Sequence, residues 1–204
     1  MFIAMRSARA AFIGVPILVC LSMSAACVGA PRPVYRAADV VNIAAAGAYR
    51  VTTYGDIDAP KLPDELWHIR ASPFTIDGVE KPGFRAEILD TEGKSATLSV
   101  VFFKVGETLY ADTSVLRAPV NEIASMHLAP LHTVSRVVKT DDTLAFHPLI
   151  DDWMKKNARA LKPVDMGEFV VLMADAAAWR TFLASKTAPA AFAEKPLIVL
   201  QREK

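Results

Sequence analysis

Alternation of apolar and polar residues dominates the middle of the chain and predicts β-strands. In residues 66–71 every second residue is apolar (Trp67, Ile69 and Ala71), which is the period of a half-buried strand. Similar short runs, separated by glycine and aspartate, recur along the rest of the chain. We expect strands at 49–53, 66–71, 84–89, 96–104, 108–113, 131–139, 143–147, 169–173 and 196–202.

The residues between these runs predict tight turns. Residues 90–93 and 105–107 each contain a glycine, which supplies the positive φ that a tight hairpin needs. The three strands that they separate are therefore expected to form an antiparallel meander. Asp77-Gly78 predicts a further turn, and residues 141–142 are expected to join another hairpin.

Helical periodicity is confined to the second half of the chain. Apolar residues in 150–161 recur every three or four positions, Asp151 and Asp152 fall in the expected first turn, and Pro163 follows. Asp175 can cap a second helix. The apolar face of that helix comprises Trp179, Phe182 and Leu183.

Together these patterns predict one α+β domain over residues 49–204. We expect a largely antiparallel β meander of about eight or nine strands, with two helices in the C-terminal half. The 23 Lys and Arg residues nearly balance the 22 Asp and Glu residues. Because there is no basic surplus and no acidic tail, nucleic acid is not an expected partner.

The first 26 residues have the three parts of an export signal. Arg6 and Arg9 lie in a start that lacks acids, an apolar run covers residues 10–21, and small residues precede Cys27. The apolar run is shorter than the roughly 20 residues that a membrane-spanning helix needs. We therefore expect residues 1–26 to be a signal peptide.

The end of this signal resembles the lipobox of bacterial lipoproteins. The sequence Ser24-Ala25-Ala26-Cys27 matches in its two small residues and in the cysteine, and departs at Ser24, where the family usually has an aliphatic residue. The resemblance implies that Cys27 is acylated and becomes the first residue after cleavage. Cleavage by the ordinary signal peptidase, with Ser24 and Ala26 as its small residues, is the alternative.

The cysteine count favours the lipid anchor. Cys20 leaves with the signal, so Cys27 is the one cysteine that stays, and an exported protein that used disulfides would show an even number. Two or three acyl chains hold a protein stably on a bilayer. Because Val28 stands where an aspartate would resemble an inner-membrane retention signal, we expect the outer membrane, facing the periplasm; a soluble periplasmic or secreted form is the alternative. Residues 27–48 are expected to be a spacer.

The sequence contains no motif that assigns chemistry. It lacks HExxH, GxSxG and the glycine fingerprints of nucleotide sites, and the four histidines lack the spacing of a metal clamp. The acid pairs at 141–142 and 151–152 fall on an expected turn and an expected helix start. We assign no catalytic, cofactor-binding or metal-ligating residue, expect no cofactor, and favour a protein that is not an enzyme.

Three functions from different classes follow. The first is a non-enzymatic cell-envelope lipoprotein that binds, assembles or scaffolds at a membrane, with an envelope protein as partner. The second is a carrier of a lipid or other apolar molecule in a barrel-like cavity, because a strongly bent meander with many aromatic residues can enclose one. The third is a hydrolase, which requires a serine, a histidine and an acid within hydrogen-bond reach. Adjacent Phe102 and Phe103 predict a strand that is covered on both faces if both are buried.

Overall fold

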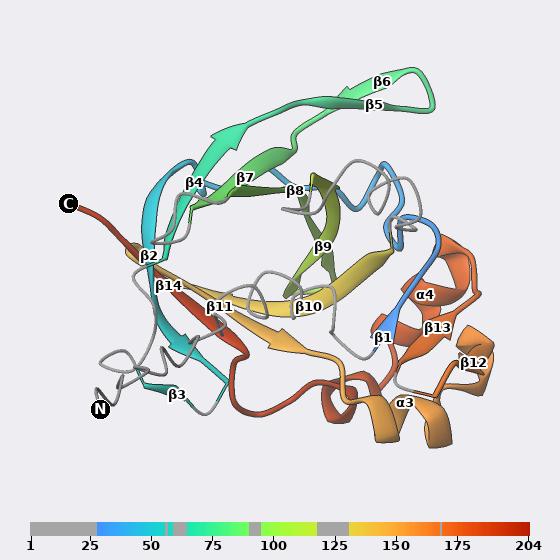
Figure 1. Ribbon diagram of the computed structural model, residues 1–204. Coiled ribbons are helices and arrows are strands. Elements are labelled where there is room, and N and C mark those ends of the chain that lie inside the picture. Colours follow the sequence, from blue (N-terminus) through green and yellow to red (C-terminus); the bar gives the residue numbers. More distant parts are fainter. Residues whose placement is uncertain (1–27, 56, 59–64, 90–94, 118–130, 168) are drawn as a thin grey trace, which may run out of the picture.

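The structure, a computed structural model, describes residues 28–55, 57–58, 65–89, 95–117, 131–167 and 169–204. Within them eight antiparallel strands form a closed barrel (Figure 1). The strands follow one another around the barrel in chain order, and the last pairs with the first. They are β2 (Gly47–Tyr54), β4 (Leu66–Ala71), β7 (Phe84–Leu89), β8 (Ser95–Val105), β9 (Thr108–Arg117), β10 (His132–Lys139), β11 (Thr143–Pro148) and β14 (Ile198–Arg202).

The predicted antiparallel strands and two helices are confirmed, and the structure is more specific than a meander. The strand β14 pairs with both β11 and β2, so the sheet closes on itself. Leu200 lies opposite Val51 in this closing ladder, whose register shifts at a bulge after Val199. The short β3 (Ile57–Asp58) pairs with the far end of β2.

The turn predicted at Asp77-Gly78 is confirmed. It joins β5 (Phe74–Ile76) to β6 (Val79–Lys81), a hairpin that projects between β4 and β7 (Figure 1). Asp77 and Gly78 both have positive φ, at 52° and 75°. A two-residue hairpin loop of type I′ requires this conformation at both positions, which explains the Asp-Gly sequence.

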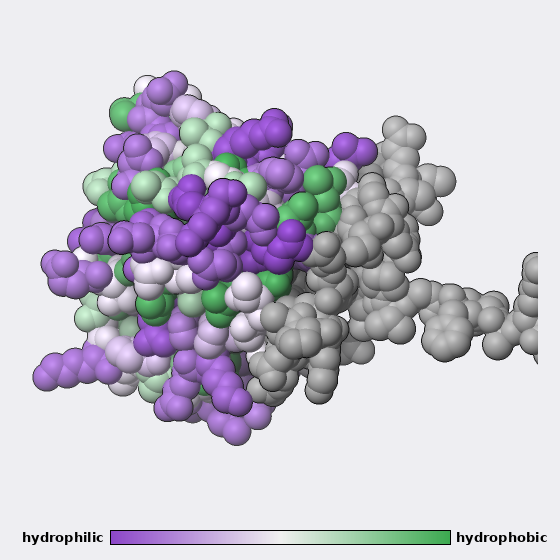
Figure 2. All heavy atoms as spheres, turned by 90° about the vertical axis from the view of Figure 1, so that its left-hand side faces the viewer, coloured by the Kyte–Doolittle hydropathy of each residue, from purple (hydrophilic) through white to green (hydrophobic). Residues whose placement is uncertain are grey.

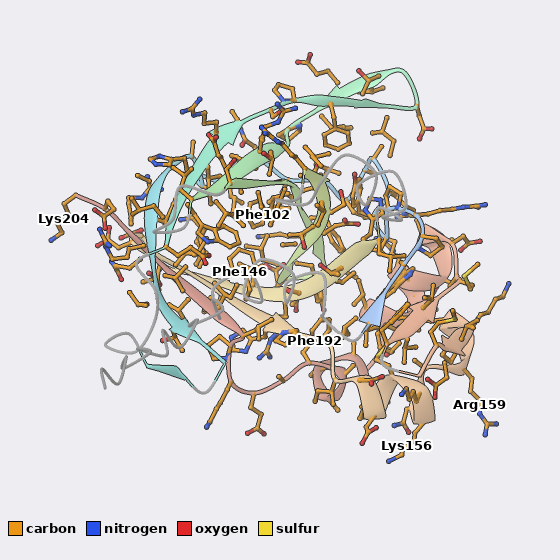
Figure 3. All side chains as sticks on the ribbon, in the orientation of Figure 1. Phe102, Phe146, Lys156, Arg159, Phe192 and Lys204 are labelled. Atoms are coloured by element: carbon orange, nitrogen blue, oxygen red, sulfur yellow. The ribbon has the colours of Figure 1, made fainter. Side chains whose placement is uncertain are left out.

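The barrel interior is a packed hydrophobic core. Alternate residues of every barrel strand point inward, as the period of two requires. Phe102 and Phe146 are among them and lie inside the ring of strands in Figure 3. The buried members are Ala45, Tyr49, Val51, Trp67, Ile69, Phe84, Ala86, Ile88, Ala96, Leu98, Val100, Phe102, Ala111, Val137, Leu144, Phe146, Ile198 and Leu200.

A second layer covers the outer face of β8, β9 and β10. It consists mainly of residues 149–197, which lie between β11 and β14 and appear beside the barrel in Figure 1. Phe103 belongs to this outer core while Phe102 belongs to the inner one, and both are buried. The prediction that this strand is covered on both faces is therefore confirmed. The elements of the layer are α3 (Asp151–Asn157), η2 (Arg159–Leu161), β12 (Pro163–Asp165), β13 (Val170–Leu172), α4 (Ala176–Leu183) and η3 (Ala188–Ala191).

The helices of this layer follow the predicted signals. The first apolar stripe begins as α3 and continues as η2 after Ala158, and the chain then turns at Lys162, which has a φ of 52°. The predicted cap of the second helix is confirmed, because the Asp175 carboxylate accepts a hydrogen bond of 2.8 Å from the Ala178 amide. The apolar face of α4 is buried in the outer core.

The segment predicted as a spacer contributes to the fold. Its first described residues form β1 (Val28–Gly29), which runs parallel to β13 with Val28 opposite Val170. Ala30 and His132 then exchange two backbone hydrogen bonds of 2.8 Å. Val28 and Ala30 are both buried, so the chain is part of the outer core from its first described residue onward.

One end of the barrel is covered by residues 39–46. Backbone bonds join this segment to the end of β8, and its Ala45 is buried against the inner core. Arg202 fixes the segment by donating to the carbonyl oxygens of Ala46 and Ala44, at 2.8 and 3.1 Å, and to the Tyr49 hydroxyl at 2.7 Å. The Tyr49 hydroxyl in turn donates to the Ala45 carbonyl at 2.9 Å. This barrel end is therefore closed by main chain.

The barrel face on the side of β2 and β4 is exposed to solvent. Hydrophilic residues predominate over it in Figure 2, with hydrophobic residues scattered between them. The strand β4 illustrates this exposure. Its Trp67 and Ile69 are buried and point inward, whereas Arg70 is exposed and points outward. In the described part of the chain, no helix has the length and the apolar character needed to cross a membrane.

Candidate functional site

The polar groups inside the barrel are paired with each other. Trp67 donates from its indole nitrogen to the buried Glu65 carboxylate at 2.6 Å. The hydroxyls of Thr113 and Thr133 lie 2.6 Å apart, also buried. Apolar side chains of the inner core surround these two pairs. A closed antiparallel barrel of this kind is compatible with a carrier of apolar molecules.

An opening lies in the barrel wall, where β9 and β10 diverge. Their ladder ends at the pair Tyr110–Arg136. Beyond it, Thr108 and Leu109 pair only with β8, and the last residues of β10 pair only with β11. The two strands fork at this point, and the edge of each is left without a strand partner.

A groove of about 450 Å³ occupies this fork. Its volume lies in the range of sites that hold small molecules. Leu109 and Val137 form its apolar floor and also pack in the inner core, so the groove reaches the barrel interior. The full lining is Lys104, Glu107, Thr108, Leu109, Arg136, Val137, Val138 and Lys139.

The groove carries a surplus of positive charge, with three cations and one carboxylate in its lining. Lys104 is exposed at the end of β8, and the half-buried Lys139 ends β10 and donates to the Thr140 carbonyl at 3.2 Å. Because the floor is apolar, the positive charges act near a surface that water solvates poorly. An anion in the groove would meet them there with less screening than on an open face.

Arg136 has a buried donor that lacks an acceptor among the described residues. Its Nε is buried and has no hydrogen-bond partner. Its Nη2 lies 3.4 Å from His147 Nδ1, which is itself 3.0 Å from the Ala193 carbonyl oxygen. A carbonyl oxygen only accepts, so in the tautomer that carries a proton on Nδ1, His147 donates to Ala193 and offers Arg136 no acceptor. Among the described residues the buried Nε of this guanidinium has no acceptor in either tautomer.

Arg136 also affects its strand neighbour. Burial raises the pKa of Tyr110, while a hydrogen bond with Thr108 and the positive charge of Arg136 act in the opposite direction. The two side chains lie opposite each other on the last rung of the ladder. The positive charge of Arg136 therefore acts on the pKa of a side chain at the point where β9 and β10 separate.

An Asp–His pair lies on the outer face of the barrel, with Asp112 buried and His132 partly buried. His132 Nδ1 is 2.7 Å from Asp112 Oδ1, and Asp112 Oδ2 accepts a hydrogen bond of 3.0 Å from the Val34 amide. Ser114 stands opposite His132 in the strand register, but over the described residues no serine forms a hydrogen bond with this histidine. Among the described residues, no serine is therefore hydrogen-bonded to this pair as a hydrolase would require. The hydrogen bond from Val34 shows that Asp112 holds the N-terminal segment against the barrel.

The residues singled out from the sequence are dispersed. Cys27, the predicted lipidation site, lies outside the described residues. The acid pairs lie where they were predicted: residues 141–142 join β10 to β11, and residues 151–152 form the first turn of α3. Among the described residues, no group of three or more potential metal ligands comes together.

The groove residues were not predicted from the sequence, although the sequence contains one signal for them. Residues 96–104 and 131–139 are the first and third strands of an antiparallel series, so they run in the same direction and end at the same edge. Lys104 and Lys139 are the last residues of those two predicted strands. Nothing in the sequence, however, shows that the strands fork there.

Comparison with known proteins gives no match: no protein-family model, no curated protein and no solved structure is found to be similar to this chain.

Proposed function

We propose that this protein is a non-enzymatic binding module, tethered to a membrane of the cell envelope through Cys27, that carries a small amphipathic anion. The observation that carries this proposal is the groove at the fork of β9 and β10, where an apolar floor and a surplus of positive charge meet. The proposal joins the binding-module and carrier functions considered from the sequence, and places the ligand in the wall of the barrel.

The two parts of the groove suit the two parts of such a ligand. Leu109 and Val137 offer an apolar surface that continues into the inner core. An apolar group placed on it gains about 25 cal/mol for each Å² removed from water. The guanidinium of Arg136, whose Nε has no partner among the described residues, offers the paired donors that a carboxylate or phosphate accepts. An anion there would satisfy a buried donor that is otherwise unpaired.

The tether is supported by the sequence around Cys27. A lipobox-like end, the single cysteine left after cleavage and Val28 as the following residue all agree with an acylated protein at the outer membrane, facing the periplasm. A carrier for membrane-derived anions is useful at such a place because the tether keeps it beside the bilayer.

Binding of 8-anilinonaphthalene-1-sulfonate, a fluorescent probe with apolar rings and one anionic group, tests the groove. We expect the probe to bind the purified protein with enhanced fluorescence, and Arg136→Gln to weaken binding by about tenfold, which corresponds to about 1.4 kcal/mol. Lys139→Gln should weaken it by a smaller factor, because Lys139 keeps a more exposed, better-solvated charge. Lys186→Gln, at an exposed lysine that follows α4 and lies outside the groove lining, is the matched control and should leave the affinity unchanged.

The outcome that contradicts the proposal is equally definite. Equal affinities for the wild-type protein, Arg136→Gln and Lys186→Gln would show that the probe binds elsewhere and that the groove is not the site. Thermal unfolding of each variant, followed by circular dichroism, verifies that a loss of binding does not come from a loss of folding.

A further inference from the structure

Exposed apolar side chains are concentrated in one hairpin of the outer layer. Of the eight large hydrophobic side chains that are exposed in the described part of the chain, four lie within residues 164–173, in or beside β12 and β13. They are Val164, Met166, Phe169 and Met173. A soluble surface rarely gathers such residues without a contact to cover them.

These side chains share one face of the small sheet β1–β13–β12. Residues 169, 171 and 173 alternate with the buried residues 170, 172 and 174, so they point away from the core. Val164 lies opposite Val171 in the antiparallel register and is on the same face. Met166 extends the apolar surface at the turn. We call Val164, Met166, Phe169, Val171 and Met173 the hairpin face.

The hairpin face lies beside the predicted anchor, because the residue that follows Cys27 is already paired with β13. Val28 is buried and pairs with Val170, which lies between Phe169 and Val171 on the same strand. One peptide bond joins residues 27 and 28, so an acylated sulfur at Cys27 is held within roughly 10 Å of Val28. Acyl chains on that sulfur would therefore bring this sheet to the membrane surface.

The charges around the hairpin face suit an anionic membrane. Lys156, Arg159 and Lys162 are exposed on α3, η2 and the residue before β12, and the first two point outward in Figure 3. The Lys162 carbonyl accepts a hydrogen bond of 3.3 Å from the Met173 amide, which places this lysine beside the face. The nearby negative charge of Asp165 is paired with Lys155 at 3.3 Å.

We infer that the hairpin face lies in the interface of an anionic lipid bilayer, with its apolar side chains among the acyl chains and its lysines and arginine at the lipid phosphates. The inference rests on the proposed tether at Cys27 and adds the orientation of the domain. Interfacial apolar side chains with cations at their edge bind a lipid surface by burial together with charge attraction.

Quenching by lipids that carry a doxyl group on an acyl chain tests this orientation. The full chain is expressed as Met173→Cys, labelled with an environment-sensitive fluorophore and reconstituted in vesicles of phosphatidylethanolamine and phosphatidylglycerol. Val79→Cys is the matched control, because both side chains are 52% exposed and Val79 lies on the distant β5–β6 hairpin. We expect the doxyl lipids to remove most of the fluorescence at position 173 and to leave that at position 79 unchanged.

Flotation of the same vesicles separates the two ways in which the experiment can fail. Protein that floats with the vesicles but shows equal fluorescence loss, or none, at both positions keeps its tether and overturns the orientation alone. Protein that does not float overturns the tether, and with it the orientation. A probe at 173 that is shielded as protein concentration rises in the absence of lipid would identify a second copy as the occupant and would also overturn the inference.

Discussion

Removal of the Asp112 carboxylate tests how the N-terminal segment is held to the barrel. Asp112 is 3% exposed and binds two partners, the Val34 amide at 3.0 Å and His132 Nδ1 at 2.7 Å. The negative charge also contributes to the raised pKa of the neighbouring Tyr35, after the larger effect of burial. Asp112→Ala removes both bonds and leaves the Val34 amide buried without an acceptor.

The expected cost follows from these two bonds. A hydrogen bond to a charged group is worth about 1.5–3 kcal/mol, and a buried donor without a partner costs about 1–3 kcal/mol. Because these contributions overlap, we expect Asp112→Ala to lower the free energy of unfolding by about 3–5 kcal/mol. Asp112→Asn should cost about 2 kcal/mol less, since its amide can still accept from Val34 and donate to the other tautomer of His132.

Urea unfolding and hydrogen exchange measure the two consequences. With a slope of about 2 kcal/mol per molar urea, the alanine variant should unfold at a midpoint roughly 2 M lower. The Val34 amide should exchange faster in that variant than in Asp112→Asn. Ser114→Ala, on the same face of β9, is the control and should shift stability by less than about 0.5 kcal/mol. A cost for Asp112→Ala below about 1 kcal/mol, with unchanged protection of Val34, would refute the reasoning.

Three further changes probe the core, a cap and an ion pair. Leu200→Ala, which truncates a fully buried side chain of the inner core, should lower the unfolding free energy by about 2–5 kcal/mol in urea. Asp175→Ala should cost about 1 kcal/mol through loss of the α4 cap, and Asp175→Asn less, as thermal unfolding would show. Burial opposes ionisation of Asp39, but hydrogen bonds from Arg36 and Arg180 lower its pKa overall. Its contribution to the free energy of unfolding is therefore present above about pH 4 and is lost as the pH falls through the lowered pKa. Asp39→Asn should reduce the loss of unfolding free energy that the protein shows on acidification, as urea unfolding at several pH values would measure.

Turns, helix caps and single strands could be predicted from the sequence, because each depends on the conformational preferences of a few neighbouring residues. The Asp77-Gly78 turn follows from the positive φ that both residues adopt, and the cap at Asp175 follows from its side chain. The strands between residues 84 and 113 follow from alternation and from Gly106 in their second turn. Each of these features depends on residues that are close together in the chain.

Closure of the barrel and the candidate site could not be predicted in the same way. The pairing of Val51 with Leu200 joins strands from opposite ends of the domain, and no alternation pattern encodes which distant strand is the partner. The groove exists because β9 and β10 stop pairing after Arg136, and no residue pattern in the sequence marks that position. In the sequence, Arg136 is one of several charged residues on predicted strands. Only the structure shows that its buried Nε lacks a partner.

The order of the strands has a consequence for how the chain matures. β14 comes last in sequence and is the strand that seals both β2 and β11. Until residues 198–202 have been synthesised, the sheet has two open edges that can pair with another extended peptide. The chain therefore depends on protection from aggregation until its closing strand has paired with both edges.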